Sequence, residues 1–480
     1  MTEVPQENLV GRTLSNLASA WRDIAQSAAR TVGIAKAPVS TEPDALKRLM
    51  RDCLEARGGE VSARMRAAEL GRIYLEQDAE GRERFLTVLA REFAVSSEAV
   101  DAAVAGYQSA LTDAERLVAE AALRRALQPP RLRLLTQFNA LPEGVKFLVD
   151  LRADILALRS DDPYLKGLDD DLRELLLSWF DTGFLDLRAI DWNSPAALLE
   201  KLVAYEAVHQ ITSWQDLRNR LDSDRRCYAL FHPRMPDEPL AFVEVALVRG
   251  MAGSIQALLD EKAPEMDPQQ ADAAIFYSIS NTQKGLKQIS FGDYLIKRVV
   301  QTLSREFPRL KIFATLSPIP GFRRWLEALP EDDLAAAFAP EDLAELPALG
   351  KDRGLKTVIA DLVGGGGAAP EGVRGLQRPL TGLAARYLAT KRDDGQPLDP
   401  VARFHLRNGA RIERLNWLGD ASGNGMAQSC GLMVNYRYVV DEIEANHEGY
   451  MKDGQIALGP EMRGLLRSLR DASGARLRVD

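Results

Sequence analysis

A serine enclosed by prolines is the first group in this chain that could do chemistry. It lies in the segment Leu316-Ser317-Pro318-Ile319-Pro320-Gly321-Phe322. Pro318 favours an extended backbone at Ser317 and lacks the N–H that the residue after a hydrolase nucleophile contributes to the oxyanion hole. A covalent acyl-serine is therefore disfavoured, whereas a hydroxyl that hydrogen-bonds or relays protons from a rigid position fits the pattern. A serine without a chemical task is the simpler alternative.

Histidine is the second source of proton chemistry. The chain has four of these residues, His209, His232, His405 and His447, and no pair has a metal-ligand spacing such as His-Glu-x-x-His, so no zinc site is predicted. His405 stands between apolar neighbours just before a predicted turn, where a structural histidine is the default interpretation. If it shared a pocket with Ser317, its near-neutral pKa would suit proton delivery.

The loop before Tyr294 could hold an anion. Gly292 and Asp293 stand where a helix is predicted to begin, and the first N–H groups of a helix lie unpaired at the positive end of its dipole. Lys284 and Lys287 add positive charge, so a phosphate or pyrophosphate would be stabilised there. The alternative is that Asp293 simply caps the helix. A glycine run at residues 364–367 lacks the Lys-Ser or Lys-Thr of a P-loop and predicts a surface loop.

A strand–helix–strand unit must position these groups. The residue types predict strands at 274–279 and 311–316, with an amphipathic helix at 294–307 between them. Such a crossover makes the strands parallel neighbours with their carboxyl ends at one edge, where open α/β sheets bind ligands. Ser317, one residue past the second strand, and the loop at 281–292 would both stand at that edge. Strands at 226–231 and 240–248 predict a hairpin.

The first part of the chain is predicted to be helical. Apolar residues recur at helical spacing through residues 43–180, without strand-like alternation. Thr112-Asp113-Ala114-Glu115 has the pattern of a capping box, and Ser194 before Pro195 predicts a later helix with the serine as its N-cap. The helical part could offer a partner surface, although a bundle that packs on itself is the simpler interpretation.

Composition limits the classes of function. The chain has 480 residues, 46 % of them hydrophobic, and its formal net charge of −8 provides no global positive field for nucleic acid or an anionic membrane. No apolar run reaches the length of about eighteen residues that a membrane span needs. The widely spaced Cys53, Cys227 and Cys430 predict neither disulfides nor a zinc site, which fits a reducing cytosol. Acidic residues interrupt the amphipathic segment at residues 9–33, so no organelle presequence is expected.

Several segments, in the same order, resemble the malonyl-CoA decarboxylase family across roughly residues 179–438. They are Phe276-Tyr277-Ser278-Ile279-Ser280, Leu295-Ile296-Lys297-Arg298-Val299-Val300, Leu316-Ser317-Pro318-Ile319-Pro320-Gly321-Phe322, Phe404-His405-Leu406 with Asn408-Gly409-Ala410, and Ser429-Cys430-Gly431-Leu432-Met433 followed by Asn435-Tyr436-Arg437-Tyr438. The resemblance implies an α+β multidomain protein. Residues 1–180 would form an N-terminal all-helical bundle for oligomerisation, and residues 181–480 a catalytic α/β domain with a mixed sheet. That domain would be similar to the GNAT acetyltransferases, which bind coenzyme A at a strand-to-helix junction.

The resemblance also implies site residues, partners and a location. Ser317 and His405 match the catalytic serine and histidine of the family, and Asn416 and Tyr438 are expected to orient His405 or the thioester, with packing roles as the alternative. The malonyl-CoA-binding stretch is matched by Lys287, Gln288, Ile289, Ser290, Phe291, Gly292 and Asp293. Animal members carry a glutamate at the position of Ser290, so the contacts there stay open. We expect a cytoplasmic, bacterial homo-oligomer, a dimer or tetramer through the helical domain.

The chemistry asked of these residues is the loss of CO₂ from malonyl-CoA. Decarboxylation leaves an enolate, which must be stabilised at the thioester oxygen and protonated at carbon to give acetyl-CoA, and it requires neither a metal nor an organic cofactor. We expect His405, protonated or hydrogen-bonded to Ser317, to donate the proton while Ser317 orients the carboxylate and relays protons. Two other functions stay open: a GNAT-type acyl-CoA-dependent acyltransferase and a non-catalytic acyl-CoA sensor.

Overall fold

The chain folds into two compact units. The computed structural model describes residues 21, 42–55, 59–289, 291–346, 354–364 and 374–473. The helical unit comprises Met1–Asp186, Phe231–Leu240 and Asn281–Ser290, and the sheet unit comprises Leu187–Leu230, Ala241–Ser280 and Phe291–Asp480. Most of the segment at residues 9–33, Ser290 and the glycines at 365–367 lie outside the described residues.

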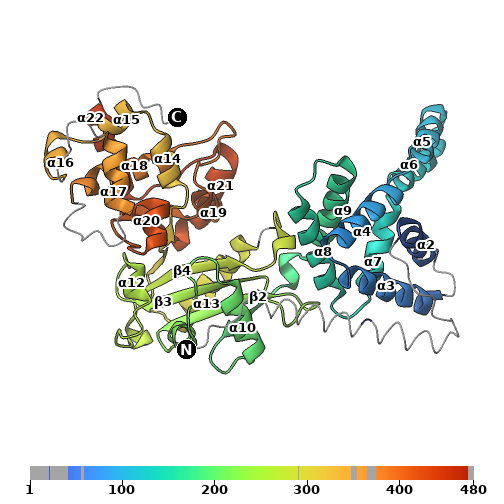
Figure 1. The fold of residues 1–480 in the computed structure, drawn as a ribbon, viewed down its shortest axis with the longest axis horizontal. Helices are drawn as coiled ribbons and strands as arrows, with labels where there is room; N and C mark the ends of the chain where they lie inside the picture. Colours follow the sequence, from blue (N-terminus) through green and yellow to red (C-terminus); the bar gives the residue numbers. More distant parts are fainter. Residues whose placement is uncertain are drawn as a thin grey trace. The chain divides into compact units, whose positions relative to one another are not determined.

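Amphipathic helices build the helical unit, as the sequence predicts (Figure 1). They are α2 (Pro43–Leu54), α3 (Gly59–Leu75), α4 (Ala79–Glu92), α5 (Ser97–Ser109), α6 (Asp113–Ala126), α7 (Pro130–Phe138), α8 (Gly144–Leu158) and α9 (Pro163–Trp179). The capping box of α6 is confirmed: Thr112 accepts a hydrogen bond from the backbone N–H of Glu115, whose carboxylate accepts one from the N–H of Thr112. The caps satisfy N–H groups that have no partner within the helix.

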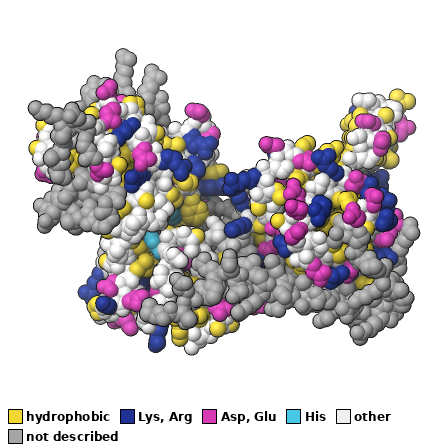
Figure 2. All heavy atoms as spheres, viewed as in Figure 1, with side chains coloured by type: hydrophobic (Ala, Val, Ile, Leu, Met, Phe, Trp, Pro, Cys, Tyr) yellow, Lys and Arg dark blue, Asp and Glu magenta, His cyan; other side chains and the backbone are white. Residues whose placement is uncertain are grey.

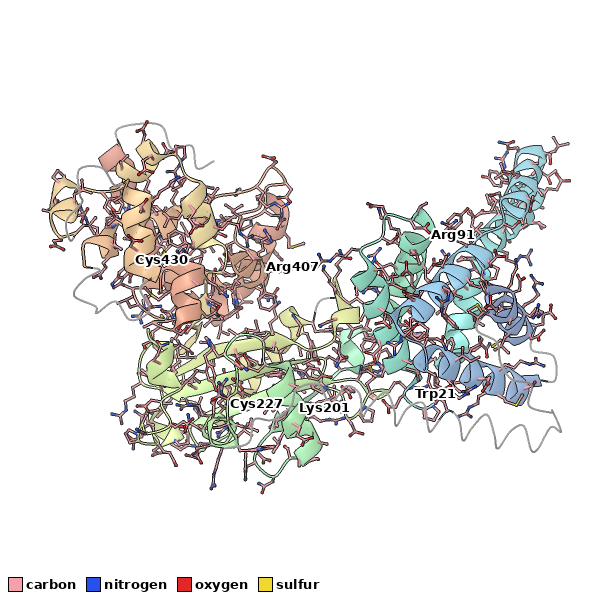
Figure 3. All side chains as sticks on the ribbon, viewed as in Figure 1. Trp21, Arg91, Lys201, Cys227, Arg407 and Cys430 are labelled. Atoms are coloured by element: carbon pink, nitrogen blue, oxygen red, sulfur yellow. The ribbon has the colours of Figure 1, made fainter. Side chains whose placement is uncertain are left out.

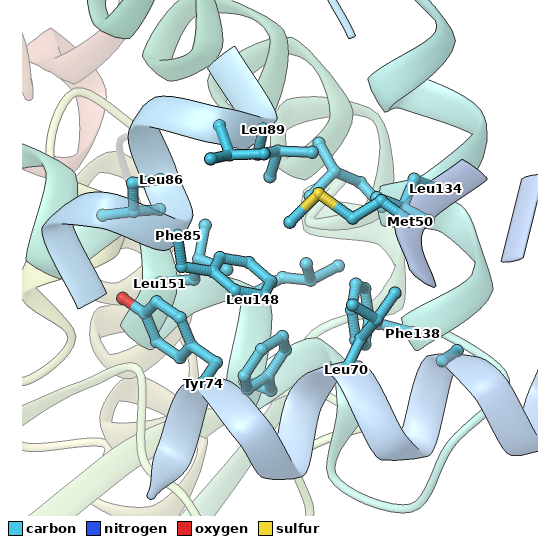
Figure 4. Packing of buried hydrophobic residues seen from close by; sticks show 14 of the residues in the cluster. Met50, Leu70, Tyr74, Phe85, Leu86, Leu89, Leu134, Phe138, Leu148 and Leu151 are labelled. Carbon is cyan, nitrogen blue, oxygen red and sulfur yellow. The ribbon is translucent and has the colours of Figure 1, made fainter. Parts of the chain in front are cut away.

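The core of this unit is made by the helical stripes of the sequence (Figure 4). Leu70, Phe85 and Leu148, from three different helices, are buried in it. Trp21 also packs there, with its ring centroid 4.8 Å from that of Phe147 and its indole N–H donating to a backbone carbonyl. By contrast, α5 and α6 form a hairpin that contributes no buried residue.

A mixed sheet forms the centre of the other unit, as expected for the fold class. Its strands are β1 (Asp186–Ile190), β2 (Arg225–Phe231), β3 (Ala241–Val248), β4 (Ala273–Asn281), β5 (Ile312–Thr315), β6 (Ser317–Pro318), β7 (Arg411–Asn416) and β8 (Met433–Arg437). The order is β1-β2-β3-β4-β5-β8-β6, with β7 paired to β8. The β2–β3 hairpin is antiparallel and β4 is parallel to β5, so both predicted pairings are confirmed. The register of β4 with β5 runs from Ala273–Ile312 to Phe276–Thr315, whereas β4, which has β3 on its other side, continues to Asn281.

Helices and short turns complete the sheet unit. They are η1 (Thr182–Phe184), α10 (Ala196–Tyr205), α11 (Trp214–Arg220), α12 (Ile255–Leu258), η2 (Pro268–Gln270), η3 (Lys284–Leu286), α13 (Gly292–Glu306), α14 (Phe322–Ala328), α15 (Glu331–Ala335), α16 (Pro340–Ala344), α17 (Leu355–Gly364), α18 (Arg374–Ala389), α19 (Pro400–Arg407), α20 (Gly423–Ser429), η5 (Val440–Glu442), α21 (Ile443–Asp453) and α22 (Pro460–Ser473). Of these, η1 and η3 belong to the helical unit by their residue numbers. None of the helices within the described ranges is both long and apolar enough to span a bilayer.

The structure adds detail at the start of α10, at Ser317 and at the cysteines. Pro195, not Ser194, is the N-cap of α10, because the Ser194 hydroxyl accepts a hydrogen bond from the N–H of Asp191 instead. Ser317 does not follow the sheet but belongs to it, in the two-residue strand β6. Cys53, Cys227 and Cys430 are free and buried, and the labelled Cys227 and Cys430 lie far apart (Figure 3).

Candidate active site

Ser317 lies where the chain passes from one strand to the next. Thr315 ends β5, and in β6 Ser317 stands opposite Val434 of β8. The backbone is extended there, as Pro318 requires. Ser317 is 6 % exposed, and its Oγ donates a hydrogen bond of 2.8 Å to Oγ1 of Thr315. The same Oγ is 3.3 Å from Nε2 of His405, so the structure brings together the two groups that the sequence singles out.

His405 is carried by α19, whose ends are set by local sequence. Asp399 caps the helix by accepting the N–H of Ala402, and Pro400 occupies the first turn, where its missing N–H costs nothing. Gly409 follows the helix with φ +79°, and a Cβ there would lie 2.2 Å from the carbonyl oxygen of Ile443. Only glycine fits this exit, which places His405 in the last turn of the helix.

The imidazole of His405 is held on both nitrogens and on one face. Its Nδ1 is 2.7 Å from the phenolic oxygen of Tyr438, and its ring stacks on that of Tyr436 at a centroid distance of 4.5 Å. All three side chains are buried. Tyr438, one of the two supporting residues expected from the sequence, therefore contacts His405 directly.

The hydrogen bonds run in one direction through these side chains. Thr315 Oγ1 accepts from the Ser317 hydroxyl and from the backbone N–H of Tyr436. With the Ser317 hydroxyl donating to Thr315, the network assigns the tautomer of His405 that donates from Nε2 to Ser317 and accepts from Tyr438 at Nδ1. Each side chain thus donates a hydrogen bond to the next, in the order Tyr438, His405, Ser317 and Thr315.

Burial decides the charge of His405. It lowers the pKa of the imidazole to about 3, so the ring is neutral at physiological pH. Of the two forms considered for His405, the neutral ring hydrogen-bonded to Ser317 is the one that this environment favours.

Asn416, the other expected supporting residue, lies one step further away. Its amide donates to Asn435 Oδ1 over 2.8 Å. Asn435, buried in β8, in turn donates to the carbonyl oxygen of Thr315 at 2.6 Å and to that of Ala252 at 3.0 Å, and it also accepts from Arg414. Asn435 and Thr315 were not assigned roles from the sequence. Two features of the sequence could have indicated these roles. Asn435 lies in a segment that resembles the family, and Thr315 precedes Ser317 by two residues, a spacing that places both on one face of a strand.

The stretch matched to malonyl-CoA binding divides between the two units. Lys287 and Gln288 are exposed and Ile289 is buried in the helical unit, whereas Phe291 begins the part in the sheet unit. Helix α13 begins at Gly292, and its N-cap, Phe291, makes no side-chain cap. Asp293 is thus the second residue of α13.

Among the side chains that the structure describes, no group of three or more His, Cys, Asp and Glu residues is arranged to hold a metal ion.

Known proteins similar to this chain come from one family. A family model described as the malonyl-CoA decarboxylase C-terminal domain matches residues 183–476, and one described as the N-terminal domain of the same family matches residues 93–180. The mitochondrial malonyl-CoA decarboxylase of Mus musculus is 37 % identical over 412 residues, which cover 82 % of this chain and 84 % of that protein. The protein of that name from Anser anser anser is 36 % identical over 428 residues, covering 86 % and 85 %.

Solved structures give the same result. The crystal structure of malonyl-CoA decarboxylase from Rhodopseudomonas palustris superposes with a TM-score of 0.77 at 40 % identity, covering 90 % of this chain and 100 % of that one. The enzyme of the same name from Agrobacterium vitis gives a TM-score of 0.76 at 41 % identity, covering 88 % and 99 %.

Proposed function

Because the chain belongs to the malonyl-CoA decarboxylase family and so converts malonyl-CoA to acetyl-CoA and CO₂, we propose that Ser317 and His405 perform the proton transfer of that reaction. The observation that carries the proposal is the buried contact of 3.3 Å between Ser317 Oγ and His405 Nε2, continued by Tyr438 at Nδ1. A neutral, ordered donor chain of this kind suits protonation of an enolate.

The proposed reaction begins with cleavage of the bond between the carboxylate carbon and the methylene carbon. CO₂ leaves, and the electron pair of that bond forms the thioester enolate, whose oxygen carries the developing charge. The Ser317 hydroxyl turns from Thr315 to the substrate and gives its proton to the methylene carbon, which is more basic in an enolate than an alkoxide oxygen is. Nε2–H of His405 then returns a proton to Ser317, Nδ1 receives one from Tyr438, and solvent restores the last proton.

The thioester itself serves as the electron sink, so we propose that the reaction needs neither a metal nor an organic cofactor. Hydrogen-bond donors aimed at a developing oxyanion contribute about 10² to 10³ in rate. A positioned proton donor contributes about 10² to 10⁴.

For the coenzyme A part of the substrate we propose the start of α13, in the sheet unit, as a phosphate site. The support is that Phe291 leaves the first N–H groups of this helix without a side-chain cap, and that α13 is long enough for a full dipole. The exposed Lys284 and Lys287, in the helical unit, we propose as separate contacts to the substrate. Beyond Phe276, the edge of β4 that faces away from β3 is no longer paired with β5, and we propose that it offers backbone groups to the two amides of the pantetheine arm.

We expect malonyl-CoA labelled in its free carboxylate to release labelled CO₂ with purified protein alone, one CO₂ for each acetyl-CoA formed. In D₂O the acetyl-CoA should carry one solvent deuterium, because the enolate carbon takes its proton from the exchangeable chain. Gas trapping and mass spectrometry measure both. Acetyl transfer that begins only when an amine is added would support the acyltransferase instead, and malonyl-CoA that binds and is recovered unchanged would support the sensor.

We further propose that residues 1–180 mediate homo-oligomerisation, as a dimer or tetramer, while residues 181–480 carry catalysis in a bacterial cytoplasm. The support for the first part is the α5–α6 hairpin, whose surface shows hydrophobic side chains (Figure 2). Leu111, Leu117 and Val118 are 93 %, 67 % and 70 % exposed in the single chain. Clustered apolar exposure of this kind marks interaction surfaces.

Charged residues at these positions should reduce the oligomer. We expect the double variant Leu117→Glu with Val118→Lys to elute as a smaller species than the wild-type protein, because charges cannot be buried unpaired in an interface. Light scattering coupled to size exclusion measures the mass. The control is Lys166→Ala on α9, also exposed, which should leave the mass unchanged. An unaltered oligomer in the double variant would assign the contact to another surface.

A further inference from the structure

A buried guanidinium of the helical unit supports the stretch matched to substrate binding. Arg152, on α8, has no exposed surface. Its Nε donates to Asp169 Oδ1 of α9 at 2.8 Å, and its Nη1 donates to the carbonyl oxygens of Gly285 and Lys287 at 2.7 and 2.9 Å. One side chain thus links two helices to two peptide groups of the loop.

The loop also rests directly on the backbone of α8. A Cβ at Gly285 would lie 1.8 Å from the carbonyl oxygen of Val149, so no other residue fits without moving one of the two segments. On its other side the loop is fastened to the β2–β3 turn, where Gln283 donates to the carbonyl oxygen of Pro239 at 3.0 Å and the N–H of Thr282 donates to that of Leu240. These contacts lie within the helical unit.

Arg152 controls the peptide group that precedes a strained residue. Gln288 has φ +70°, in the left-handed region that non-glycine residues rarely adopt, and its side chain is exposed. The φ angle of Gln288 depends on the orientation of the Lys287 carbonyl, which is one of the two groups that Arg152 holds. Strain of this kind persists only where the surroundings impose it, and it is common at ligand sites.

We propose that Arg152 is a positioning residue for malonyl-CoA: it holds Lys287 and Gln288 in the backbone conformation that binds the coenzyme A part of the substrate. The inference rests on the substrate-binding role proposed above for this stretch. It also gives the helical unit a part in substrate affinity besides oligomerisation.

The test compares two buried arginines of the same unit. Arg152→Met keeps an unbranched apolar stem but removes the donors, and we expect KM for malonyl-CoA and the Kd of free coenzyme A to rise about tenfold, with kcat changed less than about threefold. Arg131→Met is the matched control. Arg131 is 6 % exposed and also donates to an α9 carboxylate, that of Asp171, but its other bond goes to Ala90 and not to the loop. It should lower thermal stability without raising KM.

A second pair of variants keeps the test decisive if Arg152→Met does not fold. Gly285→Ala disturbs the same contact from the loop side and should raise KM, whereas Gly106→Ala on α5, where a Cβ meets nothing within 4 Å, should not. Wild-type KM in folded Arg152→Met or in Gly285→Ala would overturn the proposal, and so would an equal rise in Arg131→Met. If the wild-type protein released no CO₂, the decarboxylase function would fail, while titration with coenzyme A would still decide the role of Arg152.

Discussion

His405→Asn is expected to lower kcat for CO₂ release at least about 100-fold while the Kd of coenzyme A stays within about threefold of the wild-type value. The asparagine amide reaches about as far as Nδ1, so it can keep the contact with Tyr438, but it places no group near Ser317 Oγ, which Nε2 approaches to 3.3 Å. Proton return to Ser317 is therefore lost without removal of the substrate site. Single-turnover CO₂ release and calorimetric titration with coenzyme A measure the two effects.

Two further histidine variants show what kind of loss this is. His405→Gln restores an amide near the position of Nε2, so it should recover activity if His405 only orients Ser317, and should stay as low as His405→Asn if His405 transfers the proton, as proposed. His447→Asn on α21 is the control for a histidine outside the site and should leave kcat unchanged. Wild-type turnover in His405→Asn would remove the imidazole from the mechanism.

The pH dependence of kcat belongs to the same prediction. With the pKa of His405 lowered to about 3, the ring stays neutral from pH 6 to pH 8, and we expect kcat to show no histidine inflection in that range. A rise in kcat below about pH 6.5 would instead show that imidazolium is the acid.

The stability of the folded protein should fall as the pH is lowered. An unfolded histidine binds protons from about pH 6.5 downwards and the folded His405 does not, so its contribution to stability is complete above that pH and is lost towards pH 3. His209, whose pKa burial lowers to about 4, adds to the same acid loss.

Ser317→Ala is the second substitution with a large expected effect, a fall in kcat of at least about 100-fold. It removes the hydroxyl that stands between Thr315 and His405 and that we assign to protonation of the enolate. The missing oxygen is small and its neighbours stay in place, so the affinity for coenzyme A should not change. Because Ser317 and His405 act in one proton chain, the double variant with His405→Asn should be little worse than either single variant.

The control for Ser317 is a serine that is equally hidden. Ser62→Ala, in the helical unit, should leave kcat at the wild-type value, since that hydroxyl is also buried but lies outside the proton chain. Turnover of Ser317→Ala within a few-fold of wild type would show that His405 or water protonates the carbon. Multiplicative losses in the double variant would show that the two residues act in separate steps.

Much of the fold follows from local sequence. The helical stripes, the capping box at Thr112, the β2–β3 hairpin and the parallel β4–β5 pair are all set by side-chain periodicity, turn chemistry and the handedness of crossovers. The prediction of Ser194 as an N-cap was wrong. Its hydroxyl accepts a local hydrogen bond from the N–H of Asp191, which competes with the bond to the start of the helix. The local sequence pattern does not indicate whether a serine hydroxyl binds the N–H of a preceding residue or an N–H at the start of the following helix.

By itself, the sequence determined the types of group that the reaction needs, the strand that precedes Ser317 and the family whose motifs include His405. Only the tertiary structure decided that these two residues, 88 positions apart, meet under a tyrosine pair, that burial keeps the imidazole neutral, and that Arg152 holds the loop at residues 285–287. The physical reason is the distance along the chain over which each effect acts. Side-chain periodicity and helix caps depend on residues close in sequence. The proximity of Ser317 and His405, the desolvation of the imidazole and the hydrogen bonds to the loop carbonyls arise only when distant segments pack together, and they decide the chemistry.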